Sequence, residues 1–284
     1  MKGRNKRKGG IVENYLNLVN KILTEGISKD DRTGTGTISI FGPNMEFDLR
    51  NGFPAVTTKE LWFKGVVVEL LWMITGSESA KYMLENDVHI WDEWLTIEGM
   101  LGRVYGVQWR QWRKHRMKSL LESDLVDHID QLMNVINQIK HTPYSRRILM
   151  SNWNVGELDQ MALPPCPVLD QYYVDGDWLD GKWYQRSADV FLGLPFDIAS
   201  KALLLTLVAR QTGKKPRKLY CSIGDAHIYN NHIEQCKLQI RRHPYVSPTL
   251  NVKTDNIDID RYDFRDFELK DYFHHPAIKG DISK

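Results

Sequence analysis

The segment QRSADVFLGLPFDIASKALLLTLVA, residues 185–209, is almost entirely apolar or small, so it must lie in the core of any fold this chain adopts. From Pro195 onward it predicts a helix, because proline is tolerated in the first turn. Its longest apolar run, KALLLTLVA, is far too short to span a bilayer. Asp197 lies in the middle of the segment. A carboxylate there must be solvated, paired or protonated, because an unpaired buried charge costs several kcal/mol or more.

The rest of the chain mixes predicted helices and strands without a regular β-α-β alternation, which favours an α+β fold. Apolar residues at helical spacing predict helices over residues 11–26, 64–76 and 123–141. β-rich segments bounded by turn residues predict strands within residues 31–42, 144–154 and 168–189. At 284 residues the chain is within reach of one large domain, which we place at residues 11–284.

Residues 1–10, MKGRNKRKGG, hold five cationic side chains and no acid, whereas the whole chain has a net charge of only +2. We expect a disordered basic arm here, with a nucleic-acid-binding or targeting tail as the alternative. No apolar segment of the signal-peptide type follows, so we expect no secretory signal.

The chain has three cysteines, Cys166, Cys221 and Cys236, and no CxxC motif. This sparse, odd count argues against a disulfide framework and against a zinc site. We therefore expect free thiols in a reducing compartment, the cytoplasm, or the host cytoplasm if a phage encodes the chain.

Cys166 follows two prolines in ALPPCPVLDQ, so the chain that leads to it should be stiff. From context alone an inert packing thiol is commoner than a nucleophile, which needs cationic neighbours to lower its pKa. The chain offers Arg186 in YQRSAD, and Arg146 and Arg147 in YSRR. Arginines also bind phosphate dianions through bidentate forks, although most arginines form surface ion pairs.

GDAHIYNNH places His227 and Tyr229 two residues apart, which is one face of an extended segment. Two such polar tips can bracket a hydroxyl group. The alternative is a histidine and a tyrosine that are satisfied within the core. No third ligand recurs at a suitable spacing, so we expect no metal.

Nine short motifs follow one another along the chain: DRTGTGT, TTK, ELLW, IWDEW, LGRVYGVQW, SRR, WNVGELDQMALPPC, QRSADVFLGLPF and GDAHIYNNH. In this order the chain resembles the thymidylate synthase family, including its phage dUMP and dCMP hydroxymethylases, from about residue 11 to the end. The resemblance implies a single α+β domain around a curved mixed β-sheet flanked by helices. It also implies a homodimer formed through that sheet.

The resemblance implies the chemistry as well. Cys166 matches the thiolate that adds to C6 of a pyrimidine deoxynucleoside monophosphate, after which C5 attacks the methylene carbon of 5,10-methylenetetrahydrofolate. Glu69 matches the carboxylate that shuttles protons through ordered water, and Tyr105 matches a phenol near the C5 proton. Asp189 matches a catalytic residue that also faces the folate.

The binding residues implied by the resemblance fall into three sets. The phosphate set is Arg32, Arg186 and Ser187, joined by Arg146 and Arg147 from the partner subunit. The set that holds the sugar 3′-hydroxyl is His227 and Tyr229. The set that faces the folate is Trp91, Asp189, Leu192, Gly193 and Phe196.

Several positions depart from the family pattern. Asp197 stands where thymidylate synthases have asparagine, and Pro167 follows the nucleophile where they have histidine. Lys284 stands where a small or branched apolar residue usually closes over the folate. After TTK, where the family often carries basic residues that meet the folate tail, this chain has the run ELWFKG, so we expect weaker binding of long polyglutamate tails.

Asp197 bears on the choice of base. Uracil presents an N3–H donor and an O4 acceptor, which one amide can satisfy, whereas cytosine presents the reverse pattern. A protonated Asp can donate to N3 of cytosine and accept from its amine, and an apolar setting raises the pKa of Asp toward that form. Alternatives are a carboxylate paired with protonated cytosine, or a solvated Asp that only caps a helix.

We therefore expect a dCMP-specific one-carbon transferase, closest in logic to a phage dCMP hydroxymethylase that serves modified DNA. The alternatives are a dCMP C5 methyltransferase, and then a dUMP-methylating thymidylate synthase that tolerates Asp197. A nucleic-acid-binding protein on the same fold is a further alternative. The intact Cys166, Glu69 and Tyr105 disfavour it, because a pure binder needs no nucleophile.

Overall fold

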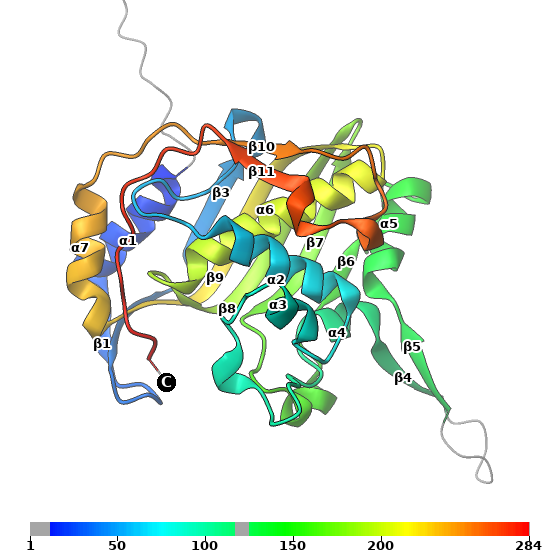
Figure 1. Ribbon diagram of the computed structural model, residues 1–284, viewed down its shortest axis with the longest axis horizontal. Coiled ribbons are helices and arrows are strands. Elements are labelled where there is room, and N and C mark those ends of the chain that lie inside the picture. Colours follow the sequence, from blue (N-terminus) through cyan, green and yellow to red (C-terminus); the bar gives the residue numbers. More distant parts are fainter. Residues whose placement is uncertain (1–11, 117–124, 284) are drawn as a thin grey trace, which may run out of the picture.

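The computed structural model describes residues 12–116 and 125–283, built around one seven-stranded β-sheet (Figure 1). The strands lie in the order β1-β2-β9-β8-β7-β6, and β3 also pairs with β9. Their bounds are β1 (Ile27–Lys29), β2 (Thr37–Phe41), β3 (Asn44–Asp48), β6 (Leu149–Ser151), β7 (Pro167–Asp175), β8 (Trp178–Asp189) and β9 (Lys215–Tyr229). β8 and β9 run parallel while the other pairs are antiparallel, which confirms the expected mixed sheet and α+β class.

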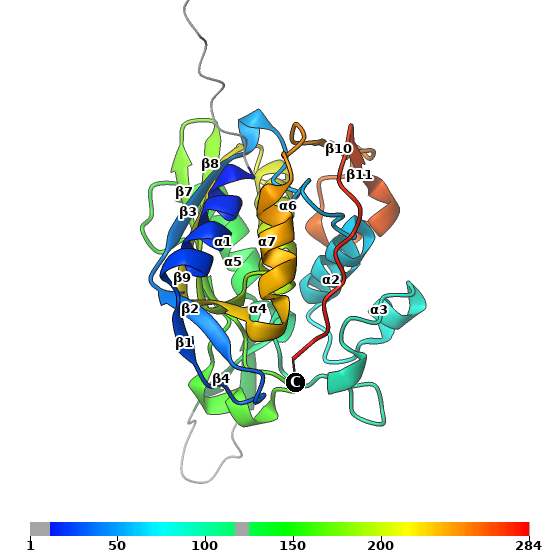
Figure 2. The same cartoon turned by 90° about the vertical axis from the view of Figure 1, so that its left-hand side faces the viewer.

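Helices α2, α6 and α7 lie to one side of this sheet (Figure 2). The helices are α1 (Glu13–Glu25), α2 (Phe63–Thr75), α3 (Lys81–Glu85), α4 (Gly106–Arg110), α5 (Gln131–His141), α6 (Gly193–Gln211) and α7 (Ile233–Arg241). Two small hairpins complete the described fold: β4 (Trp112–Arg116) with β5 (Leu125–Ile129), and β10 (Thr249–Val252) with β11 (Phe267–Lys270).

Helix α6 is the centre of the core. It connects β8 to β9, because two parallel strands need a crossover between them. It packs against both strands and against α2, so it is buried on nearly every side, as the apolar run predicts. Pro195 lies in its first turn, and Gly76 closes α2 in the left-handed conformation with φ 67°.

The helix predicted over residues 123–141 is wrong in its first half. Leu125–Ile129 form β5, and α5 begins only at Gln131. Asp130 caps α5, since its side chain accepts a hydrogen bond from Met133 N at 2.9 Å. The apolar residues of LVDHI, at positions 125, 126 and 129, do not alternate as a half-buried strand would, so the pairing with β4 and not the local pattern makes this segment a strand.

The second face of the sheet exposes aromatic and charged side chains. Along β8, Lys182 and Tyr184 are exposed, while Trp183 and Gln185, which alternate with them, are buried. Tyr173 on β7 is 66% exposed. A hollow of about 560 Å³ lies over this face, lined by Arg146 and residues of β7, β8 and β9.

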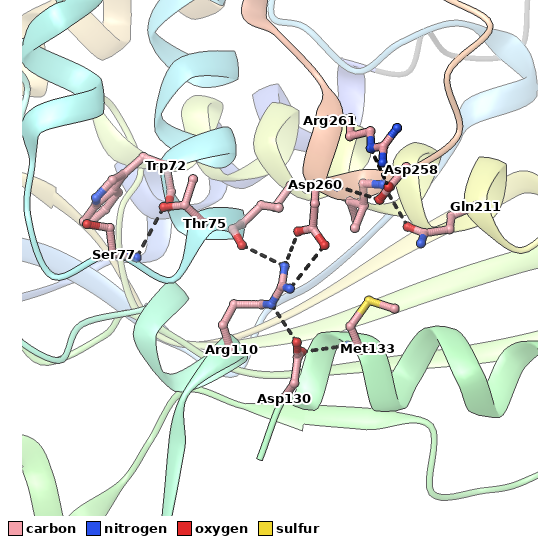
Figure 3. A network of polar contacts seen from close by, with 12 residues as sticks. Trp72, Thr75, Ser77, Arg110, Asp130, Met133, Gln211, Asp258, Asp260 and Arg261 are labelled. Carbon is pink, nitrogen blue, oxygen red and sulfur yellow. Dashed lines mark hydrogen bonds and ion pairs between the residues drawn. The ribbon is translucent and has the colours of Figure 1, made fainter. Parts of the chain in front are cut away.

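A polar network centred on Arg110 anchors the end of α4 (Figure 3). Its guanidinium donates to Asp130 Oδ2 at 2.9 Å and to the carbonyl oxygen of Ile74 at 3.0 Å. It also forms a forked pair with both carboxylate oxygens of Asp260. The network joins α2, α5 and the turn that holds Asp260, so it fixes α4, which begins directly after Tyr105.

Within residues 12–116 and 125–283, no helix has both the length and the apolar character needed to cross a membrane. The predictions for the basic arm, residues 1–10, and for Lys284 lie outside the described residues.

Candidate active site

Cys166 lies directly before β7 and is held there by Arg186 on β8. The Arg186 guanidinium donates to the carbonyl oxygen of Pro165 at 3.0 Å and to that of Pro164 at 2.8 Å. The Arg186 backbone N–H donates to the carbonyl oxygen of Cys166 at 2.9 Å. Proline restricts the backbone of the loop and the arginine fork fixes it to β8, so the thiol has a defined position.

The surroundings of Cys166 favour the thiol over the thiolate. Burial raises its pKa to about 11, and the charge of Asp197 acts in the same direction, while the Arg186 guanidinium acts against both. Addition to a ring carbon therefore requires that a base take the thiol proton, or that Asp197 be neutral when the thiolate forms.

A small cavity of about 50 Å³ lies beside Cys166. Four residues predicted for the site line it together with Pro167: Glu69, Trp91, Tyr105 and Asp197. Four residues that were not predicted complete the lining: Met73, Trp109, Ser200 and Lys201. The cavity is polar enough, and large enough, to hold ordered water.

Glu69 on α2 presents a carboxyl group to this cavity. Its Oε1 accepts a hydrogen bond from Trp91 Nε1 at 2.7 Å. Burial raises the pKa of Glu69 to about 7; the Trp91 hydrogen bond lowers it and the charge of Asp197 raises it. A carboxyl group that titrates near neutrality is well matched to taking up and releasing protons at physiological pH.

Tyr105 connects the cavity to the cysteine. Its hydroxyl accepts a hydrogen bond from Cys166 N at 3.4 Å, and burial raises its pKa well above the usual value, which keeps the phenol neutral. Its backbone has φ 34° and ψ −96°, an unfavourable conformation for a residue with a side chain. Such strain is often found at functional sites, and the anchoring of α4 through Arg110 maintains it here.

Asp197 is oriented by a hydrogen-bond relay. Trp183 Nε1 donates to Gln185 Oε1 at 2.9 Å, and Gln185 Nε2 donates to Asp197 Oδ2 at 2.6 Å. An indole N–H is only a donor, so the Gln185 amide must turn its oxygen to Trp183 and its NH₂ to Asp197. Asp197 lines the cavity, and Oδ1 is its carboxyl oxygen that does not accept from Gln185.

The protonation of Asp197 follows from its burial. Burial raises the pKa of this carboxyl to about 6, while the hydrogen bond from Gln185 and the charge of Lys201 lower it and Asp189 raises it. Asp197 can therefore carry a proton near neutral pH. A solvated Asp that only caps a helix would stay ionised at that pH.

Four of the five residues predicted to face the folate gather at the start of α6, whereas the fifth, Trp91, lines the cavity beside Glu69. Asp189 Oδ1 accepts from the backbone N–H groups of Phe191 and Leu192, at 3.0 and 3.1 Å. Leu192, Gly193 and Phe196 are all partly exposed there, and a methyl group added to Gly193 would find its nearest neighbour, Asp189 Cβ, at 3.9 Å. A partly exposed apolar surface beside a carboxylate can hold a flat ring that carries N–H donors.

His227 and Tyr229 lie on one face of β9, as predicted. Their rings meet edge to face with centroids 5.1 Å apart, and both side chains are partly exposed. His227 Nδ1 lies 3.2 Å from Asp225 Oδ1, which fixes the ring orientation. Arg32 is exposed on the turn before β2 and influences the pKa of Tyr229.

Ser187 lies on β8 directly after Arg186, so these two residues of the predicted phosphate set belong to one strand. Arg146 and Arg147 differ, because they are exposed on the connection between α5 and β6. Arg146 lines the hollow over the second face of the sheet. Among the described contacts, neither arginine is joined to Cys166 of its own chain.

Sequence reasoning missed three buried charged residues near the site: Lys59, Asp170 and Lys201. Lys59 donates to the carbonyl oxygen of Phe191, and burial lowers its pKa to about 8. Lys201 pairs with Asp170 at 2.6 Å. The sequence did contain a signal for Lys201, because this charged residue stands in the same apolar run as Asp197, four positions later.

Across residues 12–116 and 125–283, no cluster of three or more His, Cys, Asp or Glu side chains that could bind a metal ion is found. The titratable side chains of the site include the Cys166 thiol, the carboxyl groups of Glu69, Asp189 and Asp197, and the Tyr105 phenol.

A family profile described as thymidylate synthase matches residues 13–284. The match spans nearly the whole chain, including every helix and strand of the described fold. Membership implies folate-dependent transfer of a one-carbon unit to C5 of a pyrimidine nucleotide, with methylenetetrahydrofolate as the co-substrate. This chain belongs to the thymidylate synthase family.

Proposed function

We propose that this protein is a dCMP hydroxymethylase, which transfers the one-carbon unit of 5,10-methylenetetrahydrofolate to C5 of dCMP and adds water to it. The observation that carries the proposal is the environment of Asp197: a carboxyl group with a raised pKa, oriented by Gln185, where the family has an asparagine.

The relay from Trp183 supports cytosine over uracil. An asparagine at position 197 would be held by Gln185 in one orientation, with its oxygen toward the Gln185 NH₂ group. Asp197 instead offers two oxygens, one of which can carry a proton. Oδ1–H can then donate to cytosine N3 while the carboxyl group accepts from the 4-amino group. A site built for this pattern strongly disfavours the reversed pattern of uracil.

Each catalytic group has a proposed task that its geometry supports. The Cys166 sulfur adds to C6 of the pyrimidine, and C5 becomes the carbon nucleophile. Glu69 exchanges protons with the base through water in the cavity, because its pKa of about 7 allows both directions. Tyr105, as a neutral phenol beside Cys166, assists removal of the C5 proton.

Binding is proposed to divide among neighbouring elements. Arg32, Arg186 and Ser187 hold the phosphate, and His227 with Tyr229 holds the sugar hydroxyl. The surface formed by Trp91, Asp189, Leu192, Gly193 and Phe196 holds the folate. The described residues fit the flat ring of a folate, because the start of α6 is partly exposed and two backbone N–H groups already fix Asp189 Oδ1.

The second face of the sheet supports a homodimer with shared sites. Tyr173, Lys182 and Tyr184 form an exposed surface beside the hollow that Arg146 lines. We propose that a second copy packs here, which would carry Arg146 and Arg147 to the phosphate bound by the partner subunit.

We propose that the protein acts in the cytoplasm, or in the host cytoplasm if a phage encodes it.

Water, rather than hydride, is proposed to end the reaction. Hydride transfer requires water to be kept from the reacting carbon. The cavity of about 50 Å³ that Glu69 and Asp197 line supports a water supply at this place. One observation favours the second candidate, a dCMP C5 methyltransferase: Trp91 and Trp94 pack edge to face at 5.6 Å and form an apolar wall.

One experiment separates the candidates. The protein is incubated with methylenetetrahydrofolate and either dCMP or dUMP, and the nucleotide product is identified by mass. Only methylation oxidises the folate, so dihydrofolate absorbance is followed in parallel. We expect 5-hydroxymethyl-dCMP without dihydrofolate. Dihydrofolate equal to the dCMP consumed would identify the methyltransferase, and faster turnover of dUMP than of dCMP would overturn the cytosine assignment.

A further inference from the structure

A buried ion pair lies beside the Asp197 cavity and has no task in the proposed reaction. The Lys201 ammonium on α6 donates to both carboxylate oxygens of Asp170 on β7, at 2.6 and 2.7 Å. Their side chains are only 7% and 5% exposed. Removing two charges from water is costly, and their mutual attraction often does not repay that cost. Stability alone therefore does not explain the pair of Lys201 and Asp170.

Lys201 is placed to act on Asp197. The two residues are four positions apart on α6, so their side chains leave the same face of the helix, and both line the cavity. Yet no ion pair joins them among the described residues, because Lys201 turns to Asp170 instead. Asp197 receives its hydrogen bond from the neutral amide of Gln185.

The other titratable groups that face Asp197 come from several packed elements. They are Glu69 on α2, Tyr105 before α4, Cys166 before β7, Asp189 at the end of β8, Lys201 on α6 and Cys221 on β9. Of these six groups, Lys201 alone is a cation. Its charge favours the ionised form of Asp197, together with the hydrogen bond from Gln185, whereas burial favours the protonated form.

We propose that Asp170 is a specificity-determining positioning residue, which holds the Lys201 ammonium and offsets its charge so that Asp197 keeps the proton that cytosine requires. The proposal rests on the proposed function, because it concerns selection of the base. Without Asp170, the ammonium would be free to pair with Asp197 across one helical turn. An ionised Asp197 is an acceptor only and has no proton to donate to N3.

Two variants should shift the midpoint of Asp197 titration in opposite directions. Asp170→Asn keeps the shape of the side chain and releases the Lys201 charge, so we expect the midpoint of Asp197 titration to fall by about 1 unit or more. The double variant Asp170→Asn/Lys201→Met removes both charges, so we expect the midpoint to rise above that of the wild type. A purely structural pair would give neither of these opposed shifts.

The titration is followed by ¹³C NMR of labelled aspartate carboxyl groups in the full chain, with Asp197 assigned by its loss in Asp197→Asn. In parallel, the ratio of kcat/KM for dCMP to that for dUMP is measured at pH 7. We expect this ratio to fall about tenfold in Asp170→Asn, which corresponds to one unit of pKa, and to rise above that of the wild type in the double variant.

Lys237→Met is the matched control, because it removes one cation from an exposed pair with Glu234 on α7. It should shift neither the Asp197 midpoint nor the ratio. An Asp197 midpoint that is the same in wild type and both variants overturns the proposal. If Asp170→Asn does not fold, the double variant leaves no unpaired charge and carries the test alone, and an unchanged midpoint there is decisive against it.

The proposal and the proposed function fail in different ways. A wild type that prefers dUMP removes the cytosine assignment, yet opposed shifts of the Asp197 midpoint would still support control of Asp197 by Asp170. Unchanged midpoints with a clear dCMP preference would overturn only the role of Asp170.

Discussion

Gln185 and Asp197 are joined by a hydrogen bond of 2.6 Å whose direction is fixed. Trp183 occupies the Gln185 oxygen, so only the amide NH₂ group faces Asp197, and the Asp197 oxygen that meets it is an acceptor. The proton of a neutral Asp197 is thus directed to Oδ1. One tryptophan that is itself buried therefore sets the hydrogen-bond pattern presented to the ligand.

Asp197→Asn is expected to shift base preference toward dUMP, because an amide can satisfy both the N3–H donor and the O4 acceptor of uracil. In the wild type, the ratio of kcat/KM for dCMP to that for dUMP should fall as pH rises through about 6, where Asp197 loses its proton. Taking the ratio removes the pH dependence of the steps that both nucleotides share, including thiolate formation. A flat ratio from pH 5 to pH 8 in the wild type would contradict this role.

Cys166→Ser is expected to abolish turnover while the protein still folds and binds nucleotide, because a hydroxyl group is a far weaker nucleophile at neutral pH. Product formation is measured by mass and nucleotide binding by calorimetry. The matched control is Cys236→Ala, a buried thiol on α7, which should retain turnover. Full activity in Cys166→Ser would remove the covalent mechanism.

The buried carboxyl groups should make stability depend on pH. Asp197 and Glu69 have raised pKa values in the folded protein, about 6 and about 7, so between pH 4 and 7 the folded state binds more protons than the unfolded state. Their contribution to the unfolding free energy therefore falls as pH rises through this window. Asp197→Asn should unfold with a free energy roughly 2 kcal/mol higher than the wild type at pH 8, and the gap should close near pH 4. Denaturant unfolding at both pH values measures it, and an equal gap at both would be inconsistent with the burial of Asp197.

Shared sites predict complementation between inactive chains. A Cys166→Ser chain and an Arg147→Ala chain should each lack activity as homodimers, whereas their mixture should form one intact site per heterodimer. Differently tagged chains are co-purified, and product formation is measured. Verified heterodimers without any recovered activity would exclude a site that uses both chains.

The Arg110 network predicts an effect on both stability and the site. Arg110→Met leaves the Asp130 and Asp260 carboxylates without their shared partner. Because both carboxylates are partly exposed, we expect the unfolding free energy to fall by about 2 kcal/mol. Because α4 begins directly after Tyr105, turnover should fall as well. Asp260→Asn retains a hydrogen-bond acceptor at a half-exposed position, so it should have only a small effect on both. Equal losses in the two variants would argue against Arg110 as the centre of the network.

Much of this fold could be predicted because its strongest patterns are local. The apolar run of α6 and the left-handed Gly76 that ends α2 are determined by neighbouring residues. The strand Leu125–Ile129 was missed, because its pairing with β4 depends on contacts that the local pattern does not contain.

The candidate site shows the same division. Cys166, Glu69, Tyr105 and Asp197 follow from motifs. The structure brings the last three together around one cavity, and Tyr105 joins Cys166 to it through a hydrogen bond. The partners that control Asp197 do not follow from motifs, because Gln185 lies 12 residues away and the ion pair between Lys201 and Asp170 spans 31 residues. Such partners depend on the packing of α6 against the sheet.

The protonated state of Cys166 has a consequence outside catalysis. With a pKa of about 11, only about one thiol in ten thousand is a thiolate at pH 7. Peroxide and alkylating agents react with thiolates, so the resting enzyme should survive oxidants that inactivate proteins with acidic cysteines. The protein therefore has a nucleophile that is chemically quiet until its substrate chemistry begins.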